Sequence, residues 1–205
     1  MFPLKQRTAA EGVTHHQQIP VRVYINDSVQ KPRIDRSVRM AYAALVPKIV
    51  SRQTSINVME VGCGTGDIAG SLAELLPGNY IVGVDCNEAA IAEAKLRWRH
   101  AKFIHSAIGD SLKSQWDLVI LCEFLEHVEN PVMVAKGCLS HADSSLISHP
   151  LNETRGSTCS GGDHQWSFTM EDHFDFFFVG GHRTVETEQF KMGEYQMIIS
   201  RGQKR

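Results

Sequence analysis

The feature that most constrains the fold is the segment VMEVGCGTGD at residues 58–67. An apolar run ends there, three glycines follow at alternate positions, and a helical pattern of apolar residues begins directly after them. Glycines at such a junction let the chain turn sharply and let its bare backbone approach a ligand. The segment therefore predicts a buried strand, a ligand-facing loop and a helix in immediate succession.

The rest of the chain alternates short apolar runs with helical patterns, which is typical of a parallel sheet covered by helices. Two late strand-like runs, residues 182–190 and 194–201, are joined only by Lys191, Met192 and Gly193, which indicates an antiparallel hairpin. The expected sheet is therefore mixed, with its antiparallel strands at the carboxyl end. The earlier strands are expected at residues 56–61, 80–85, 102–105, 117–122 and 144–148.

Before the glycine loop, residues 34–49 carry apolar side chains at helical spacing, and Pro47 is expected to bend or shorten that helix. Residues 1–33 show no convincing period, so we expect an N-terminal arm or lid there and one domain over residues 34–205. Asn87 is expected to cap the helix that follows it, because its side chain accepts backbone hydrogen bonds at a helix start.

The composition excludes several classes of protein. With 42% hydrophobic and 21% charged residues, the chain matches an ordinary globular protein rather than a disordered or fibrous one. Its net charge of −2 gives no general attraction for nucleic acid. Five cysteines without a CxxC pair, no secretory leader pattern and no long apolar run predict reduced thiols in a cytoplasmic protein that does not span a membrane.

Three acidic residues stand beside the ends of the expected parallel strands. Glu60 precedes the first glycine, and Glu123 follows the fourth strand. Asp85 ends the second strand, 19 residues beyond Gly66. A dinucleotide site has a similar strand, loop and acid, but its third glycine comes three residues after the second, whereas Gly64 and Gly66 are two apart. Nucleotide binding or a purely structural turn is the alternative interpretation at this point.

The segments EVGCGTG, GVD and DLVILCEFLEHV, at residues 60–66, 83–85 and 117–128, resemble the class I S-adenosylmethionine-dependent methyltransferases. The sequence pattern of these segments is most similar to that of the UbiG-like small-molecule group, methyltransferase types 11, 12 and 23. The resemblance covers roughly residues 34–201. It implies an α/β fold, a Rossmann-like, doubly wound, mixed seven-stranded sheet with an antiparallel carboxyl-terminal strand. It also implies S-adenosyl-L-methionine as the cofactor and methyl transfer to an oxygen or nitrogen of a small molecule.

By this resemblance, the glycine loop lines the methionine part of the cofactor and Asp85 accepts hydrogen bonds from both ribose hydroxyls. Family members commonly hold adenine with an acid after the third strand, where this chain has Ala107 and Ile108. Adenine could instead be held by backbone groups together with an apolar contact from Ile108. The other alternative is that Asp110 binds it, which requires a shift of the loop. The full set of expected cofactor contacts is Glu60, Gly62, Cys63, Gly64, Gly66, Asp85, Cys86, Ala107, Ile108 and Glu123.

Residues that could take part in methyl transfer follow the fourth expected strand. If residues 123–127 open a helix, the spacing i, i+3, i+4 puts Glu123, Glu126 and His127 on one side. His164, in a glycine-containing segment before an expected cap at Thr169, is the fourth candidate. These four residues suit a divalent metal ion, and Glu123, His127 and His164 also suit acid–base catalysis. The alternative is that they stabilise a helix start and pack locally.

Three hypotheses about function follow. The first is an enzyme that methylates a small-molecule substrate, with Asn152 and Arg155 as candidate substrate contacts. The second is a metal-dependent RNA 2′-O-methyltransferase, because the ExxEH segment followed by a later histidine also resembles the motif of those enzymes. The lack of an excess of basic residues disfavours a nucleic acid partner. The third is a non-catalytic cofactor-binding subunit. The sequence gives no indication of the oligomeric state.

Overall fold

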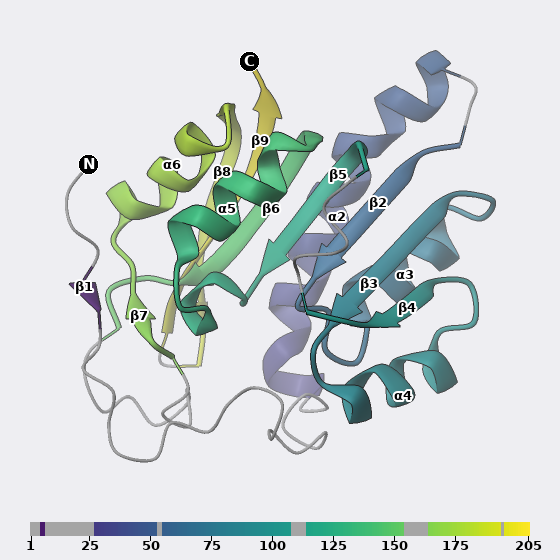
Figure 1. Ribbon diagram of the computed structural model, residues 1–205, viewed down its shortest axis with the longest axis horizontal. Coiled ribbons are helices and arrows are strands. Elements are labelled where there is room, and N and C mark those ends of the chain that lie inside the picture. Colours follow the sequence, from purple (N-terminus) through teal and green to yellow (C-terminus); the bar gives the residue numbers. More distant parts are fainter. Residues whose placement is uncertain (1–4, 7–26, 53–54, 108–113, 154–163, 194) are drawn as a thin grey trace.

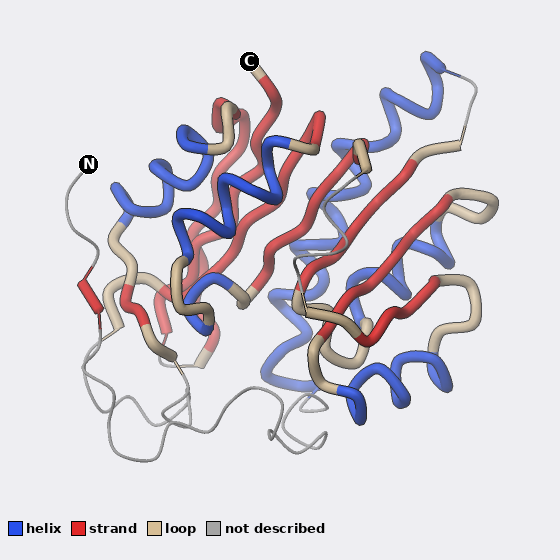
Figure 2. The backbone as a smooth tube through the Cα atoms, in the orientation of Figure 1, coloured by secondary structure: helices blue, strands red, loops and turns tan. Residues whose placement is uncertain are grey.

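The computed structural model describes residues 5–6, 27–52, 55–107, 114–153, 164–193 and 195–205. Seven strands form one sheet in the order β4-β3-β2-β5-β6-β9-β8, with helices on both of its faces (Figures 1 and 2). The strands of this sheet are β2 (Asn57–Val61), β3 (Tyr80–Asp85), β4 (Lys102–His105), β5 (Trp116–Cys122), β6 (Ala142–Pro150), β8 (His182–Met192) and β9 (Tyr195–Lys204). The predicted Rossmann-like mixed sheet is confirmed.

Strands β2 to β6 run parallel, and β9 pairs antiparallel with both β6 and β8. The predicted carboxyl-terminal hairpin is therefore confirmed. The arrowheads of β2, β3, β5 and β6 point to the same end of the sheet in Figure 1. The loops that follow these strands consequently meet at one edge, where open α/β sheets bind their ligands.

Two apolar cores lie on opposite faces of the sheet. Buried side chains of α2 (Asp27–Arg52), α3 (Asp67–Leu75) and α4 (Glu88–Arg97) pack into one core. Those of α5 (Pro131–Ser140) and α6 (Met170–Val179) pack into the other. Every residue of β5 is buried, because this strand lies near the middle of the sheet with a core on each side.

The helix starts follow the predicted capping chemistry. Asn87 accepts a hydrogen bond from Ala90 N at the start of α4. Thr169 and Asp172 form a reciprocal capping box at the start of α6. Asn130 accepts from Met133 N, and Pro131 occupies the first turn of α5, where its missing N–H costs no hydrogen bond.

The first helix is longer than expected. Helix α2 begins at Asp27, so the boundary expected after residue 33 falls inside it. The helix also continues past Pro47 to Arg52, so Pro47 does not end it. A short antiparallel pair, β1 (Lys5–Gln6) with β7 (Trp166–Ser167), joins the N-terminal part of the chain to the segment that leads into α6. Within the described residues, no helix is both long and apolar enough to cross a membrane.

Candidate functional site

The glycine loop between β2 and α3 has the backbone conformation for which only glycine is well suited. Gly62, Gly64 and Gly66 have φ values of 70°, 51° and 78°, all in the left-handed region. The N–H groups of Gly62 and Cys63 both donate to Val84 O, at 2.8 and 3.1 Å, which holds the loop against the end of β3. A Cβ on Gly62 would clash with the ring of Phe124, so the loop also packs closely against the residue after Glu123.

Asp85 joins the glycine loop to the next loop of the edge. Its Oδ2 accepts from Gly64 N at 2.8 Å, and its Oδ1 accepts from Asn87 N at 2.8 Å. The residue is only 5% exposed. An ionised carboxylate has about four acceptor positions, so two remain after these backbone bonds. Asp85, the acid predicted at the tip of the strand, therefore orders two loops even without a ligand.

Glu60 lies beneath the loop rather than at its surface. Its Oε2 accepts from Ala69 N in α3 at 2.8 Å. Burial raises the pKa of Glu60 to about 8, against the Ala69 hydrogen bond and the opposing charge of Arg33. The structure thus gives Glu60 a role in ordering the loop and the start of α3.

On the side expected for adenine, fewer of the predicted residues can be placed. Cys86 is partly buried, and its carbonyl oxygen accepts from His105 Nε2 at 3.1 Å. Ala107 is exposed, and its carbonyl accepts from Ser106 Oγ at 2.8 Å. Ile108 and Asp110 lie outside the described residues.

The condition for grouping Glu123 with Glu126 and His127, a helix that opens at residues 123–127, is not met. The chain instead forms a single turn of 3-10 helix, η3 (Leu125–His127), and α5 starts only at Pro131. Glu123 has a φ of 52°, which is outside the helical region, so the i, i+3, i+4 geometry of a helix does not apply to it. Its Oε1 accepts from Ser148 Oγ at 3.0 Å, at the tip of β6. Glu123 therefore does not join Glu126 and His127 in one group.

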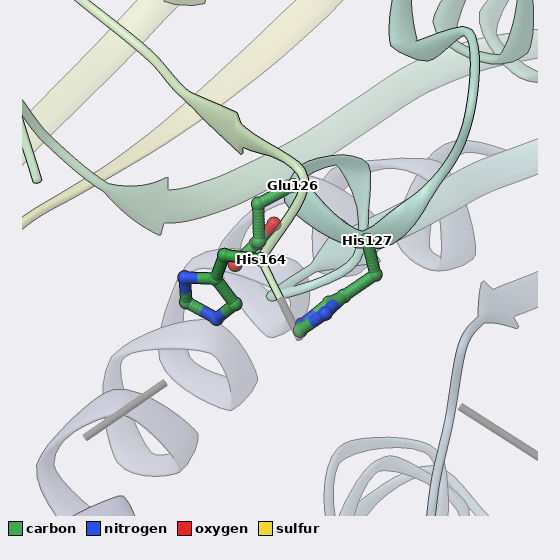
Figure 3. A group of neighbouring side chains, drawn as sticks. All are labelled: Glu126, His127 and His164. Atoms are coloured by element: carbon green, nitrogen blue, oxygen red, sulfur yellow. The ribbon is translucent and has the colours of Figure 1, made fainter. Parts of the chain in front are cut away.

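The other three metal candidates do come together. One ligand atom each from Glu126, His127 and His164 lies within 4.8 Å of the others. Figure 3 shows that Glu126 and His127 come from η3, whereas His164 comes from the segment that leads into β7. The two imidazole rings meet edge to face with centroids 4.6 Å apart.

Glu126 is the unusual member of this group. Its side chain is buried, the residue being 1% exposed, and neither carboxyl oxygen has a hydrogen-bond partner among the described residues. Burial, with the charge of nearby Glu123, raises the pKa of Glu126 well above its usual range. A buried carboxyl without partners is costly, so it indicates a site built for a cation or a proton.

Hydrogen bonds fix His164 beside η3. Gln165 N donates to Glu126 O at 2.7 Å, and Gln165 Nε2 donates to His127 O at 2.8 Å. Trp166 Nε1 donates to Val128 O at 2.7 Å. The two parts of the group, 38 residues apart in sequence, are therefore joined by side-chain and backbone bonds.

Two residues near the site were missed by sequence reasoning. Burial raises the pKa of both Glu123 and Glu60, and the positive charge of Arg33 in α2 acts to lower it. Arg33 therefore lies near enough to interact electrostatically with both acids. Glu153 accepts from His164 Nδ1 at 2.7 Å. An arginine in a helix and an acid in a loop carry no local signal, so only their position in the fold identifies them.

The substrate contacts expected after β6 are only partly placed. Asn152 is exposed, has a φ of 50°, and its N–H donates to Phe168 O at 2.8 Å. This bond draws the loop after β6 toward β7. Arg155 lies outside the described residues.

Comparison with known proteins agrees with this geometry. Residues 59–144 match the family model described as a methyltransferase domain. A ubiquinone biosynthesis O-methyltransferase from Pseudomonas putida (strain F1) is 32% identical over 88 residues, which is 40% of this chain and 37% of that protein. The chain therefore matches well under half the length of this relative.

Solved structures share the fold over nearly the whole chain. Magnesium protoporphyrin IX methyltransferase from Synechocystis PCC 6803 with bound SAH superposes with a TM-score of 0.71 and 18% identity, covering 90% of this chain and 92% of that one. An N-methyltransferase from Bradyrhizobium japonicum WM9 in complex with S-adenosyl-L-homocysteine gives 0.67 and 16%, covering 92% and 93%.

Proposed function

We propose that this chain, a class I S-adenosylmethionine-dependent methyltransferase by its fold and its matched domain, methylates an oxygen or nitrogen of a small-molecule acceptor. One observation carries the proposal. Three glycines in the left-handed region follow β2, and one of them, Gly64, donates its N–H to Asp85 at the tip of β3. Such a backbone cradle beside a carboxylate suits a ligand that has both a charged chain and a ribose.

The residues around the cradle fit S-adenosyl-L-methionine. Gly62, Cys63, Gly64 and Gly66 line its methionine part, and the two remaining acceptor positions of Asp85 take the ribose hydroxyls. The methionine part ends in a carboxylate, which suits the guanidinium of Arg33, and an ammonium, which suits the carboxyl oxygens of Glu123. Cys86 and Ala107 complete the adenine side. The bound cofactor supplies a methyl group on a positively charged sulfur.

The acceptor is methylated at the edge formed by η3 and the segment before β7. The acceptor atom forms a bond to the methyl carbon as the carbon–sulfur bond breaks, and an acceptor hydroxyl must lose its proton. His127 and His164 carry ring nitrogens suited to receive that proton.

The same group fits a divalent metal ion. Glu126, His127 and His164 would hold it, because two imidazoles and one carboxylate suit manganese, iron, cobalt or zinc better than magnesium. A metal at this place would polarise an acceptor oxygen. The buried carboxyl of Glu126, without a partner among the described residues, is the feature that supports a cation here.

A panel of phenols, carboxylic acids and amines incubated with labelled S-adenosyl-L-methionine tests the proposed activity. We expect labelling of one class of acceptor, and loss of transfer in His127→Ala and His164→Ala without loss of cofactor binding. His100→Ala, which alters an exposed histidine in the turn between α4 and β4, is the matched control. Binding without transfer to any acceptor, including RNA, would instead support the non-catalytic hypothesis.

Chelation separates the two chemistries of the site. If a metal is used, chelator abolishes transfer and added manganese or zinc restores it; if chelator has no effect, acid–base catalysis by the histidines is favoured. RNA as the acceptor would be recognised by binding that weakens steeply with salt. The free thiols of Cys63, Cys86, Cys122 and Cys138 support a reducing, cytoplasmic location as part of this proposal.

A further inference from the structure

The loop after β6 is attached to the segment that carries His164. Asn152 N donates to Phe168 O at 2.8 Å, and Ser167 Oγ donates to Glu153 O at 2.9 Å. Leu151 and Phe168 also form an isolated β-bridge. These bonds hold the backbone of Glu153 at a fixed place beside His164. The histidine segment is therefore held on two sides, by η3 and by the end of β6.

The side chain of Glu153 completes this attachment. It is 1% exposed, and its Oε2 lies 2.7 Å from His164 Nδ1. A carboxylate oxygen accepts and does not donate, so the imidazole hydrogen belongs on Nδ1. With Nδ1 so occupied, the lone pair of the neutral ring is on Nε2.

We propose that Glu153 is a positioning residue for His164, which fixes the Nδ1–H tautomer and the ring orientation so that Nε2 serves the group with Glu126 and His127. The inference rests on the proposed function, because it assigns Glu153 to the acceptor site of that reaction. It holds whether Nε2 takes a proton or binds a metal. In both cases a partner on the other nitrogen sets which nitrogen is available.

The tautomer can be read directly by NMR of the full chain with ¹⁵N-labelled histidine, at one alkaline pH where the ring is neutral. We expect the His164 signals to show the hydrogen on Nδ1 in the wild type. Glu153→Met keeps the length of the side chain but removes the acceptor, so a substantial Nε2–H population should appear. Glu153→Gln keeps an acceptor oxygen and should retain the Nδ1–H form.

Transfer to the acceptor found in the panel provides the second readout. Glu153→Met should slow transfer about 10–100-fold, the range for partners of this kind, with cofactor affinity unchanged. Glu153→Gln should recover a large part of that loss. Glu74→Met, the same exchange at an exposed acid of α3, is the matched control and should keep the tautomer.

The outcomes separate this inference from the proposed function. A wild-type His164 with its hydrogen on Nε2 would overturn the positioning role without any variant. An unchanged tautomer in Glu153→Met would do the same. If the tautomer responds as expected but no acceptor is methylated, the positioning holds and the proposed function fails.

Discussion

At the scale of single residues, Asp85 has a structural task in addition to the ligand-binding task proposed for it. Its two oxygens accept from the N–H groups of Gly64 and Asn87, which belong to two different loops. The sequence indicated the ligand-binding role, because a carboxylate at the tip of the second strand is suited to a ribose. Only the structure shows that the same carboxylate also holds the glycine loop.

Replacing Asp85 should therefore have two effects. Asp85→Ala leaves two buried backbone donors without acceptors, each worth about 1–3 kcal/mol of unfolding free energy. It should also weaken cofactor binding about ten-fold or more, since charge-assisted bonds to the ribose are lost. Urea unfolding measures the loss of stability, and calorimetry measures the loss of cofactor affinity. Asp85→Asn keeps one acceptor oxygen and should be intermediate in both; equal binding by all three proteins would contradict the assignment.

The conformation of Gly64 leads to a second prediction. Its φ of 51° is unfavourable for a branched side chain, so Gly64→Val should cost about 1–2 kcal/mol in strain. The added side chain also stands where the backbone is proposed to approach the cofactor. We expect cooperative urea unfolding at a lower midpoint and no measurable cofactor binding in calorimetry. Normal binding by this variant would show that the loop does not cradle the cofactor.

At the scale of elements, a hydrogen-bond chain that is buried except at its Thr187 end joins β6, α6, β9 and β8. His149 Nδ1 donates to Pro150 O at 2.9 Å, so His149 Nε2 must accept, and His173 Nδ1 donates to it at 2.8 Å. Ser200 Oγ then donates to His173 Nε2, and Thr187 Oγ1 donates to Ser200 Oγ, both at 2.8 Å. The single carbonyl at one end thus sets the direction of every bond, and both histidines are neutral.

This chain predicts a loss of stability in acid. Burial lowers the pKa of His149 to about 4. A lowered folded pKa means that the neutral form is stabilising above the ordinary value of 6.5, and that this stability is lost as the pH falls toward 4. Between pH 7.5 and pH 5 the loss from His149 is about 2 kcal/mol. Burial lowers the pKa of His173 in the same direction.

Comparison of variants isolates the effect from other titrating groups. The difference in unfolding free energy between the wild type and His149→Gln should shrink by about 2 kcal/mol from pH 7.5 to pH 5, because the variant has no group to protonate. Urea unfolding at the two pH values measures it. A difference that stays constant would mean that His149 is accessible to protons in the folded protein.

At the scale of the whole molecule, the site is assembled at the one edge where the parallel strands end. The loops after β2, β3, β5 and β6 all contribute, and the segment before β7 joins them from the carboxyl-terminal half. A ligand bound there contacts segments from much of the chain. Binding should therefore stabilise the protein as a unit.

S-adenosyl-L-homocysteine should raise the unfolding free energy by about 2.7 kcal/mol at 100 times its Kd. For a chain of this size, that corresponds to an increase in Tm of roughly 5–10 °C. Thermal unfolding with and without the ligand measures the shift. Gly64→Val should show no shift at the same ligand concentration, and a wild type without any shift would argue against cofactor binding.

Much of the fold and of the cofactor side could be predicted from local signals. The glycine loop, the caps at Asn87 and Thr169, and the short connection that makes the hairpin are each encoded within a few residues. Such features depend on backbone conformation and nearby hydrogen bonds, which local sequence determines.

The acceptor side was predictable only in part. Glu126, His127 and His164 were named from spacing and resemblance, but Glu123 was grouped with them on the expectation of a helix that does not form. A left-handed φ at Glu123 is set by packing between the ends of β5 and β6, not by any local preference of glutamate. Local propensity cannot reveal a constraint of that kind.

The sequence by itself therefore determined the order of the elements, the mixed sheet and the loop that is proposed to meet the cofactor. Only the tertiary structure decided that Glu123 faces Ser148, that Arg33 lies near the acids, and that Glu153 holds His164. The physical reason is distance along the chain. These contacts join elements that meet only after the parallel strands have aligned their carboxyl ends, so they depend on the whole packed sheet rather than on any one segment.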